Sequence, residues 1–168
     1  FSRFSFHNCM HQTEADDAAT VNVNFTGALE NSFYNCTFGA STIERGAANA
    51  TLKFNTSSGR LYFKDCLFKA MADKTTPLHI SVAAGGLIDT NIFEDCLFCG
   101  YSTNWDSAGK LAACILDAQT ATHEIILKNC FLNKGIADWE ATAASGNVYI
   151  NPATATAAAL GILVNNET

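Results

Sequence analysis

The sequence has little charge, few prolines and no long apolar run. Charged residues make up 15% of the 168 residues, and 16 acidic against 10 basic residues give a formal net charge of −6. Globular domains usually carry roughly a quarter charged residues. So few cations provide no basic face, which argues against a nucleic-acid partner. No run approaches the roughly 20 apolar residues of a membrane span, so no membrane contact is expected.

Composition also sets the class of protein. Hydrophobic residues make up 48% and aromatic residues 11% of the chain, so a core can form and intrinsic disorder is excluded. The length suits one domain. No signal-peptide pattern opens the sequence, and the first residue is Phe1 rather than methionine. We therefore expect the chain to be a piece of a longer polypeptide.

Five of the seven cysteines mark a repeat. They are separated by 27, 30, 30 and 34 residues: Cys9, Cys36, Cys66, Cys96 and Cys130. Their surroundings align without gaps as FHNCMH, FYNCTF, FKDCLF, FEDCLF and LKNCFL. Short β-branched or aromatic runs form a weaker repeat at 21–25, 51–55, 77–81, 113–117 and 147–151. Their alternation of period two predicts strands, and only 13–20 and 153–160 are weak helix candidates.

A unit of about 30 residues with two or three strands cannot bury its own apolar face. Stacking equivalent units about 4.8 Å apart would bury a continuous column. The predicted fold class is all-β, a parallel solenoid of about five rungs over residues 1–151, followed by an apolar tail over 152–168 that caps the last rung or serves as an assembly arm. One inward stack is predicted from Phe6, Phe33, Phe63, Phe93 and Leu127, together with the five repeated cysteines. A second stack is predicted from His11, Phe38, Phe68, Phe98 and Leu132.

A polar residue precedes each repeated cysteine. These residues are Asn8, Asn35, Asp65, Asp95 and Asn129. Short Asn and Asp side chains hydrogen-bond neighbouring backbone at bends. We therefore predict a turn ladder that runs along one corner of the solenoid.

The repeated F-x-[ND]-C-x-F, with Asn or Asp at a bend, resembles the rungs of the right-handed parallel β-helix, the pectin-lyase-like superfamily. The resemblance covers residues 4–151. It implies the fold and its right hand, which is also the hand expected of parallel crossovers. Members include polysaccharide lyases and hydrolases, bacterial surface adhesins, phage tailspikes and capsid-associated proteins, so the resemblance does not select one function.

Glycan-active proteins of this fold carry clusters of Asp, Arg or Lys on outward positions of neighbouring rungs. The corresponding positions here, one before each Asn or Asp, are His7, Tyr34, Lys64, Glu94 and Lys128. This column holds one carboxylate, whereas glycoside hydrolysis requires a pair. Asp65 and Asp95 alternate with asparagine in the ladder, which suits hydrogen bonding better than proton transfer. No catalytic residue is predicted.

The cysteines are interpreted as reduced core residues, which implies folding in a reducing host cytoplasm. Cys96 and Cys99 form a C-x-x-C, but a zinc site would need two more ligands. His7, Cys9 and His11 are expected to alternate on one strand, with both histidines on one face, and to pack the first rung. No metal and no cofactor are predicted.

Two tryptophans lie in irregular connections, each beside a carboxylate. Trp105 precedes Asp106, and Trp139 lies between Asp138 and Glu140. An aromatic ring beside an acid can bind a sugar, or it can fold its loop back onto the column. We favour a third interpretation, contact with a partner chain, because tryptophan is a typical interface anchor.

These features favour a non-enzymatic structural protein of a virion. Low charge, reduced cysteines, an uncapped first rung and an apolar tail are typical of a domain that is covered on assembly. By resemblance, we expect a β-helical capsid decoration (cement) or tail component of a phage, a homotrimer that contacts other capsid or tail proteins. The alternative is a glycan-binding or glycan-degrading domain, such as a tailspike depolymerase or an adhesin, with polysaccharide as its partner.

Overall fold

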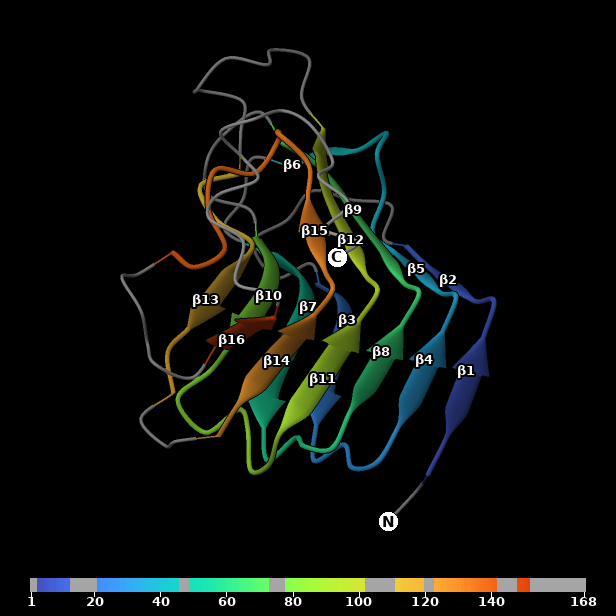
Figure 1. Ribbon diagram of the computed structural model, residues 1–168, viewed down its shortest axis with the longest axis vertical. Helices are drawn as coiled ribbons and strands as arrows, with labels where there is room; N and C mark the ends of the chain where they lie inside the picture. The colour runs from blue at the N-terminus through green and yellow to red at the C-terminus, as the bar shows by residue number, and fades with distance from the viewer. Residues whose placement is uncertain are drawn as a thin grey trace.

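The computed structural model describes residues 3–12, 21–45, 49–72, 78–101, 111–119, 123–141 and 148–151 (Figure 1). All strand pairs among these residues are parallel. The all-β solenoid class expected from the repeat is therefore confirmed. The described residues form no helix long and apolar enough to cross a membrane. The two helix candidates, 13–20 and 153–160, and the tail over 152–168 lie outside the described residues.

The strands form three sheets, named A, B and C here. Sheet A consists, in spatial order, of β1 (Ser5–His7), β4 (Ser32–Tyr34), β8 (Tyr62–Lys64), β11 (Asn91–Glu94), β14 (Ile125–Lys128) and β16 (Val148–Asn151). Sheet B consists of β2 (Met10–His11), β5 (Thr37–Phe38), β9 (Leu67–Ala72), β12 (Leu97–Tyr101) and β15 (Phe131–Leu132), with β6 (Glu44–Arg45) also paired to β9. Sheet C consists of β3 (Val21–Thr26), β7 (Ala50–Thr56), β10 (Leu78–Val82) and β13 (Ile115–Asp117).

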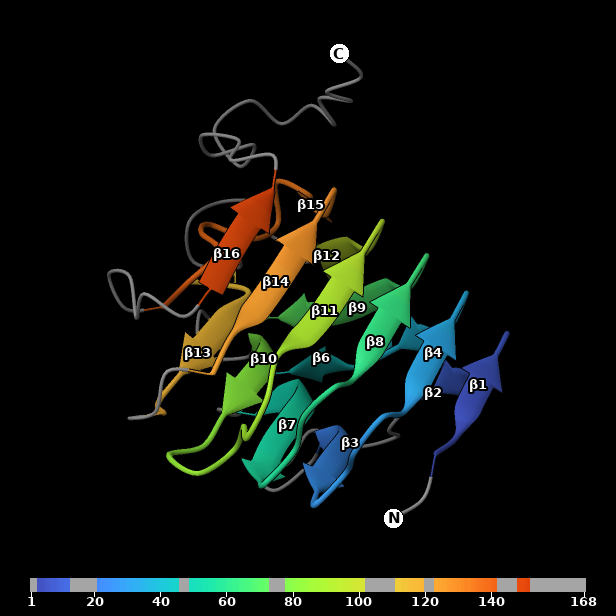
Figure 2. The ribbon, with the colours of Figure 1, turned by 60° about the horizontal axis from the view of Figure 1, so that its bottom comes forward.

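The chain visits the sheets in the order A, B, C on each turn. In Figure 1 the strands β1, β4, β8, β11 and β14 of sheet A run upward on the near side, those of sheet C run downward behind them, and successive turns advance from right to left. The coil is therefore right-handed. Figure 2 separates the layers and shows β3, β7 and β10 below the strands of sheet A.

The number of turns differs slightly from the five expected, because one strand follows the fifth turn. Among the described residues, four turns give a strand to every sheet, a fifth gives β14 and β15, and β16 returns to sheet A. In that fifth turn sheet C is continued by a bridge between Ile115 and Glu140. Residues 147–151 were expected to repeat the sheet C strands, but Val148–Asn151 pairs with β14 in sheet A. The strand Val148–Asn151 lies in sheet A because the fifth turn has already passed sheet C at Glu140.

Aromatic rings stack along the solenoid axis. Phe33 and Phe63 have ring centroids 4.8 Å apart and Phe63 and Phe93 4.5 Å, with nearly parallel planes. This stack holds all five residues of the first predicted set, Phe6, Phe33, Phe63, Phe93 and Leu127, in register. His11, Phe38, Phe68, Phe98 and Leu132 form the parallel column in sheet B. Because equivalent residues repeat at the strand spacing, each ring contacts its counterpart on the next turn.

The cysteine column lies at the bend between sheets A and B. Cys36, Cys66, Cys96 and Cys130 are buried, Cys9 is half-buried, and all are free thiols. Each buried thiol donates to two carbonyls; Cys66, for example, donates to Phe33 and Lys64. The thiols therefore hydrogen-bond to backbone carbonyls of the bend from inside the core.

The predicted ladder forms the same bend from outside. Asn8, Asn35, Asp65, Asp95 and Asn129 all have positive φ, between 50° and 56°. Asn and Asp tolerate this left-handed conformation better than other residues with a side chain. Asn35 donates to Asn8 Oδ1 and Asn129 to Asp95 Oδ1, each over 2.7 Å. The ladder thus links successive turns.

Candidate interaction surfaces

The outward positions of sheet A next to the ladder form an ion-pair cluster. Lys64 Nζ lies 3.0 Å from Glu94 Oε1 and 2.7 Å from Asp95 Oδ2, and Lys128 Nζ lies 3.2 Å from Glu94 Oε1. At the N-terminal end of the same row, His7 stacks on Tyr34 with centroids 4.8 Å apart. The structure therefore brings together the five outward residues that sequence analysis assigned to one column.

Electrostatics in this cluster favours charged carboxylates. The pKa of Glu94 is lowered by its bonds with Lys64 and Tyr62. The pKa of Asp95 is lowered by Lys64 and Asn129. Burial, together with the hydrogen bond to Glu94, raises the pKa of Tyr62 to about 12. Both carboxylates are thus held ionised and paired, an arrangement that neutralises the surface rather than storing a proton for transfer.

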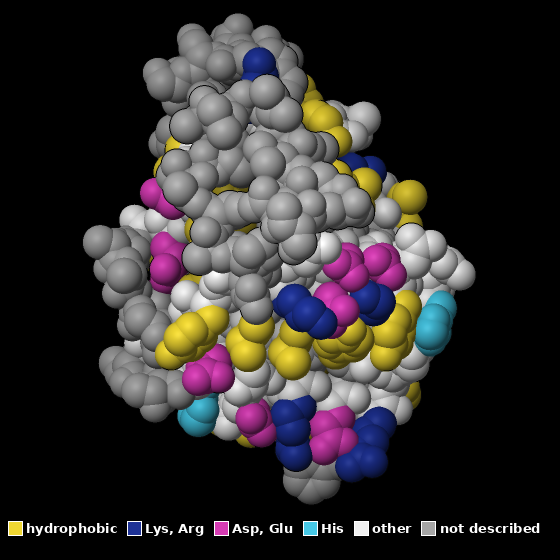
Figure 3. All heavy atoms as spheres, in the orientation of Figure 1, with side chains coloured by type: hydrophobic (Ala, Val, Ile, Leu, Met, Phe, Trp, Pro, Cys, Tyr) yellow, Lys and Arg dark blue, Asp and Glu magenta, His cyan; other side chains and the backbone are white. Residues whose placement is uncertain are grey.

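A second outward row crosses sheet A, and from β8 onward its residues are aliphatic or aromatic. Strand register aligns Tyr62 with Ile92, Ile92 with Ile126, and Ile126 with Tyr149. Figure 3 shows hydrophobic side chains in a row across sheet A, with charged side chains on both sides. We call Tyr62, Ile92, Ile126 and Tyr149 the sheet A stripe. Sequence analysis did not single it out, although the alternation around Phe63 and Phe93 places these residues outside.

A second ladder of charges borders the beginning of the sheet A strands. Glu30 pairs with Arg3 and, over 3.0 Å, with Arg60, which lies 3.4 Å from Asp89. A hollow of about 320 Å³ lies among Arg3, Leu29, Glu30 and Arg60. Basic and acidic side chains alternate along the solenoid axis, so this ladder also carries little net charge.

The outward row of sheet B carries no charge. Its residues are aligned by register across five strands: Met10, Thr37, Leu67, Leu97 and Phe131. Met10 is 65% exposed, and the other four are half-buried. We call these five residues the sheet B row. The row itself holds no charged side chain, although Lys69 follows Leu67 on the same face of β9.

The predicted tryptophan sites have different outcomes. Trp139 is 6% exposed and packs edge-on against Phe98, 5.9 Å between centroids, so it is folded back onto the core. This arrangement matches the second of the three interpretations for this residue and leaves little of the ring for a partner. Asp138 is exposed and accepts a hydrogen bond from the Trp139 amide, and Glu140 is half-buried. Trp105 lies outside the described residues.

The expected alternation of His7, Cys9 and His11 is wrong. Asn8 adopts positive φ between β1 and β2 and turns the chain from sheet A to sheet B. As a result, His7 is exposed, where it contacts Ser5 and Tyr34, whereas His11 points inward and stacks on Phe38. The C-x-x-C is also divided, because Cys96 belongs to the inward column and Cys99 aligns with Lys69 on sheet B.

A buried polar cluster was not found from the sequence. His79 and Thr51 are fully buried, with His79 Nδ1 and Thr51 Oγ1 3.3 Å apart, and Arg45 contacts both Thr51 and Asn49. The His79 ring lies against Phe68 and Phe98 of sheet B. Thr51 and His79 lie at equivalent positions of β7 and β10, between the register pairs Leu78 with Ala50 and Ile80 with Leu52. Their residue types differ, so the repeat gives no signal for the cluster.

Comparison of the chain with protein-family models, with curated proteins and with solved structures found no match.

Proposed function

We propose that this chain is a non-enzymatic structural domain of a phage virion, a capsid decoration (cement) or tail component that assembles as a homotrimer through the outer face of sheet B. The supporting observation is the sheet B row, which is apolar apart from Thr37. An apolar surface of this kind is unfavourable in water and gains free energy when another protein covers it.

A second copy of this chain fits the row better than an unrelated surface. The row repeats at the parallel-strand spacing, and a parallel neighbour presents side chains at the same spacing. Three copies around an axis parallel to the solenoid would place three such rows in one shared core. The resemblance to trimeric β-helical virion proteins supports the same arrangement.

The virion assignment is tested by mass spectrometry of purified particles from the phage that encodes the chain. We expect the protein in a fixed stoichiometric ratio to the major capsid or tail protein. Absence from every particle fraction contradicts the virion assignment. Assembly through sheet B is tested separately by the oligomeric state of the purified chain.

The sheet A stripe favours a second candidate, glycan binding. Tyr62 and Tyr149 present aromatic rings in a row with polar and charged groups on both sides, and aromatic rings with polar rims suit sugar faces. Screening against a polysaccharide panel tests binding, and release of unsaturated or reducing ends tests degradation. Binding that Tyr149→Ala abolishes and Leu97→Ala retains would support this candidate.

A further inference from the structure

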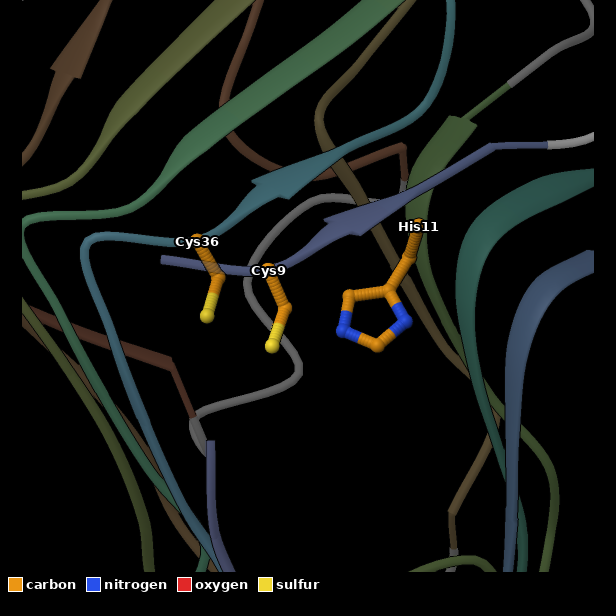
Figure 4. A group of neighbouring side chains, drawn as sticks. All are labelled: Cys9, His11 and Cys36. Carbon is orange, nitrogen blue, oxygen red and sulfur yellow. The ribbon is translucent and has the colours of Figure 1, made fainter. Parts of the chain in front are cut away.

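The first turn of the solenoid departs from the others at one inward position. His11 occupies the place that Phe38, Phe68 and Phe98 occupy on the next three turns. Beside it lie the first two members of the cysteine column. One ring nitrogen of His11 and the Sγ atoms of Cys9 and Cys36 all lie within 4.8 Å of one another (Figure 4).

His11 is poorly satisfied in this position. Its ring stacks on Phe38 with centroids 4.9 Å apart and meets the edges of Phe6 and Phe33, so apolar rings surround it. Its Nε2 is buried and has no hydrogen-bond partner in the structure. A buried polar atom without a partner costs about 1–3 kcal/mol. The other turns avoid this cost with phenylalanine or leucine.

The two thiols complete a ligand set. Cys9 and Cys36 precede β2 and β5, and Figure 4 shows both side chains pointing to the same side of the strands as the imidazole of His11. Cys9 donates to the His7 carbonyl over 3.4 Å. Both Cys9 and His11 are half-buried, so an ion and a water molecule can reach them from solvent.

We propose that Cys9, His11 and Cys36 form a zinc site at the first turn of the solenoid. Two thiolates and one imidazole are a ligand set that Zn²⁺ accepts, with water in the fourth position. Tetrahedral bonds of about 2.3 Å to sulfur and about 2.0 Å to nitrogen place the ligand atoms about 3.5–3.8 Å apart. The ligand atoms, which lie within 4.8 Å of one another, therefore need to approach by at most about 1 Å to bind the ion.

Charge also fits this assignment. Binding replaces the two thiol protons, which leave to solvent, and two thiolates balance the charge of Zn²⁺. The complex is neutral, as a site beside a stack of phenylalanines requires. It also joins two turns, because Cys9 and His11 come from the first and Cys36 from the second.

The rest of the cysteine column provides the contrast. Cys66 and Cys96 are followed two residues later by Phe68 and Phe98, where Cys9 is followed by His11. In the part of the chain that the structure describes, Cys9, His11 and Cys36 are the group placed to hold a metal ion. Cys36 shares the carbonyl bonding of Cys66 and Cys96, so bonding to the backbone does not separate the turns. The His11 nitrogen therefore distinguishes the first turn from the other turns of the column.

The test uses the full 168-residue chain, stripped of metal under reducing conditions and titrated with Zn²⁺ or Co²⁺. We expect one ion per chain, a thiolate-to-cobalt charge-transfer band, and a higher Tm with zinc. His11→Phe restores the residue type of later turns, so it should stay folded while its zinc affinity falls at least tenfold. The zinc affinity of Cys9→Ser should fall similarly, whereas Cys99→Ser, which lies outside the column, should bind zinc like wild type.

Two results would overturn the site. One is a reduced wild-type chain that binds no zinc. The other is a folded His11→Phe variant that binds zinc as tightly as wild type, because the ion would then use other cysteines. Circular dichroism of each variant establishes that it is folded before titration.

Discussion

At the scale of single residues, the corner between sheets A and B depends on backbone conformation. Each ladder residue has a positive φ. The backbone amides of the first four donate to a carbonyl on the next turn; that of Asn35, for example, donates to Lys64 O over 3.0 Å. Residues with a Cβ other than Asn and Asp lose roughly 1–2 kcal/mol in this region. The recurrence of Asn and Asp thus has a local physical cause that is independent of function.

Asn35 provides a test of this cause. Asn35→Ala should lower the free energy of unfolding by about 1–2 kcal/mol, because alanine tolerates positive φ poorly and loses the bond to Asn8. Asn35→Gly loses the same bond but keeps the backbone free. Urea denaturation should therefore rank glycine above alanine by about 1 kcal/mol. Equal stability of the two variants would show that side-chain bonding, rather than φ, selects asparagine.

His79 should make stability depend on pH. Burial, with a contribution from nearby Arg45, lowers the pKa of His79 to about 3, whereas an unfolded histidine titrates near about 6.5. Between these values the unfolded chain binds a proton that the folded chain does not. The contribution of His79 is complete above the unfolded pKa and is lost as the pH falls towards the folded pKa.

Between pH 7 and pH 5 this linkage corresponds to about 2 kcal/mol. Urea denaturation at the two pH values should show that loss in wild type, in addition to any shared change from other groups. His79→Gln removes the titrating imidazole and should show only the shared change. A variant with the same pH dependence as wild type would mean that other residues, such as His11, carry the effect.

At the scale of strands, the close stacking of successive turns limits which side chains fit between them. Gly39 follows β5 with a φ of 86°, and a Cβ there would lie 1.9 Å from the Lys69 carbonyl oxygen on the next turn. Gly27 follows β3 with a φ of 66°, but a Cβ there would meet nothing within 4 Å. The two glycines therefore separate the effect of backbone conformation from that of close approach.

We expect Gly27→Ala to lower the free energy of unfolding by about 1–2 kcal/mol, because alanine is disfavoured only by the left-handed backbone conformation there. Gly39→Ala should cost clearly more, since β5 and β9 must also move apart. Thermal or urea denaturation of both variants measures the difference. A Gly39→Ala variant as stable as Gly27→Ala would show that the turns separate easily at this point.

The repeat predicted sheets A and B well because the cysteine fixes the phase of both strands around each bend. It failed where periodicity stops. The assignment of His7 and His11 to one face ignored the bend at Asn8, and 147–151 was placed with sheet C because its composition resembles those strands. The cluster around His79 arises from the meeting of two sheets, which no local pattern reports.

At the scale of the whole molecule, the two outer faces predict different behaviour. Ion pairs along sheet A, such as Lys64 with Glu94, leave it nearly neutral but well hydrated. The sheet B row exposes aliphatic and aromatic groups without such pairs. Isolated surface residues of this kind are common, whereas five aligned residues form a continuous strip, and this strip is the basis of the proposed assembly. We therefore expect the chain to assemble through sheet B.

Sedimentation equilibrium of the full chain measures this assembly, with Leu97→Lys on sheet B and Ile92→Lys on the same turn of sheet A as a matched control. We predict that wild type and Ile92→Lys have three times the 18.0 kDa monomer mass, and that Leu97→Lys is a folded monomer. A monomeric wild type, or a Leu97→Lys variant that keeps the wild-type mass, would contradict it.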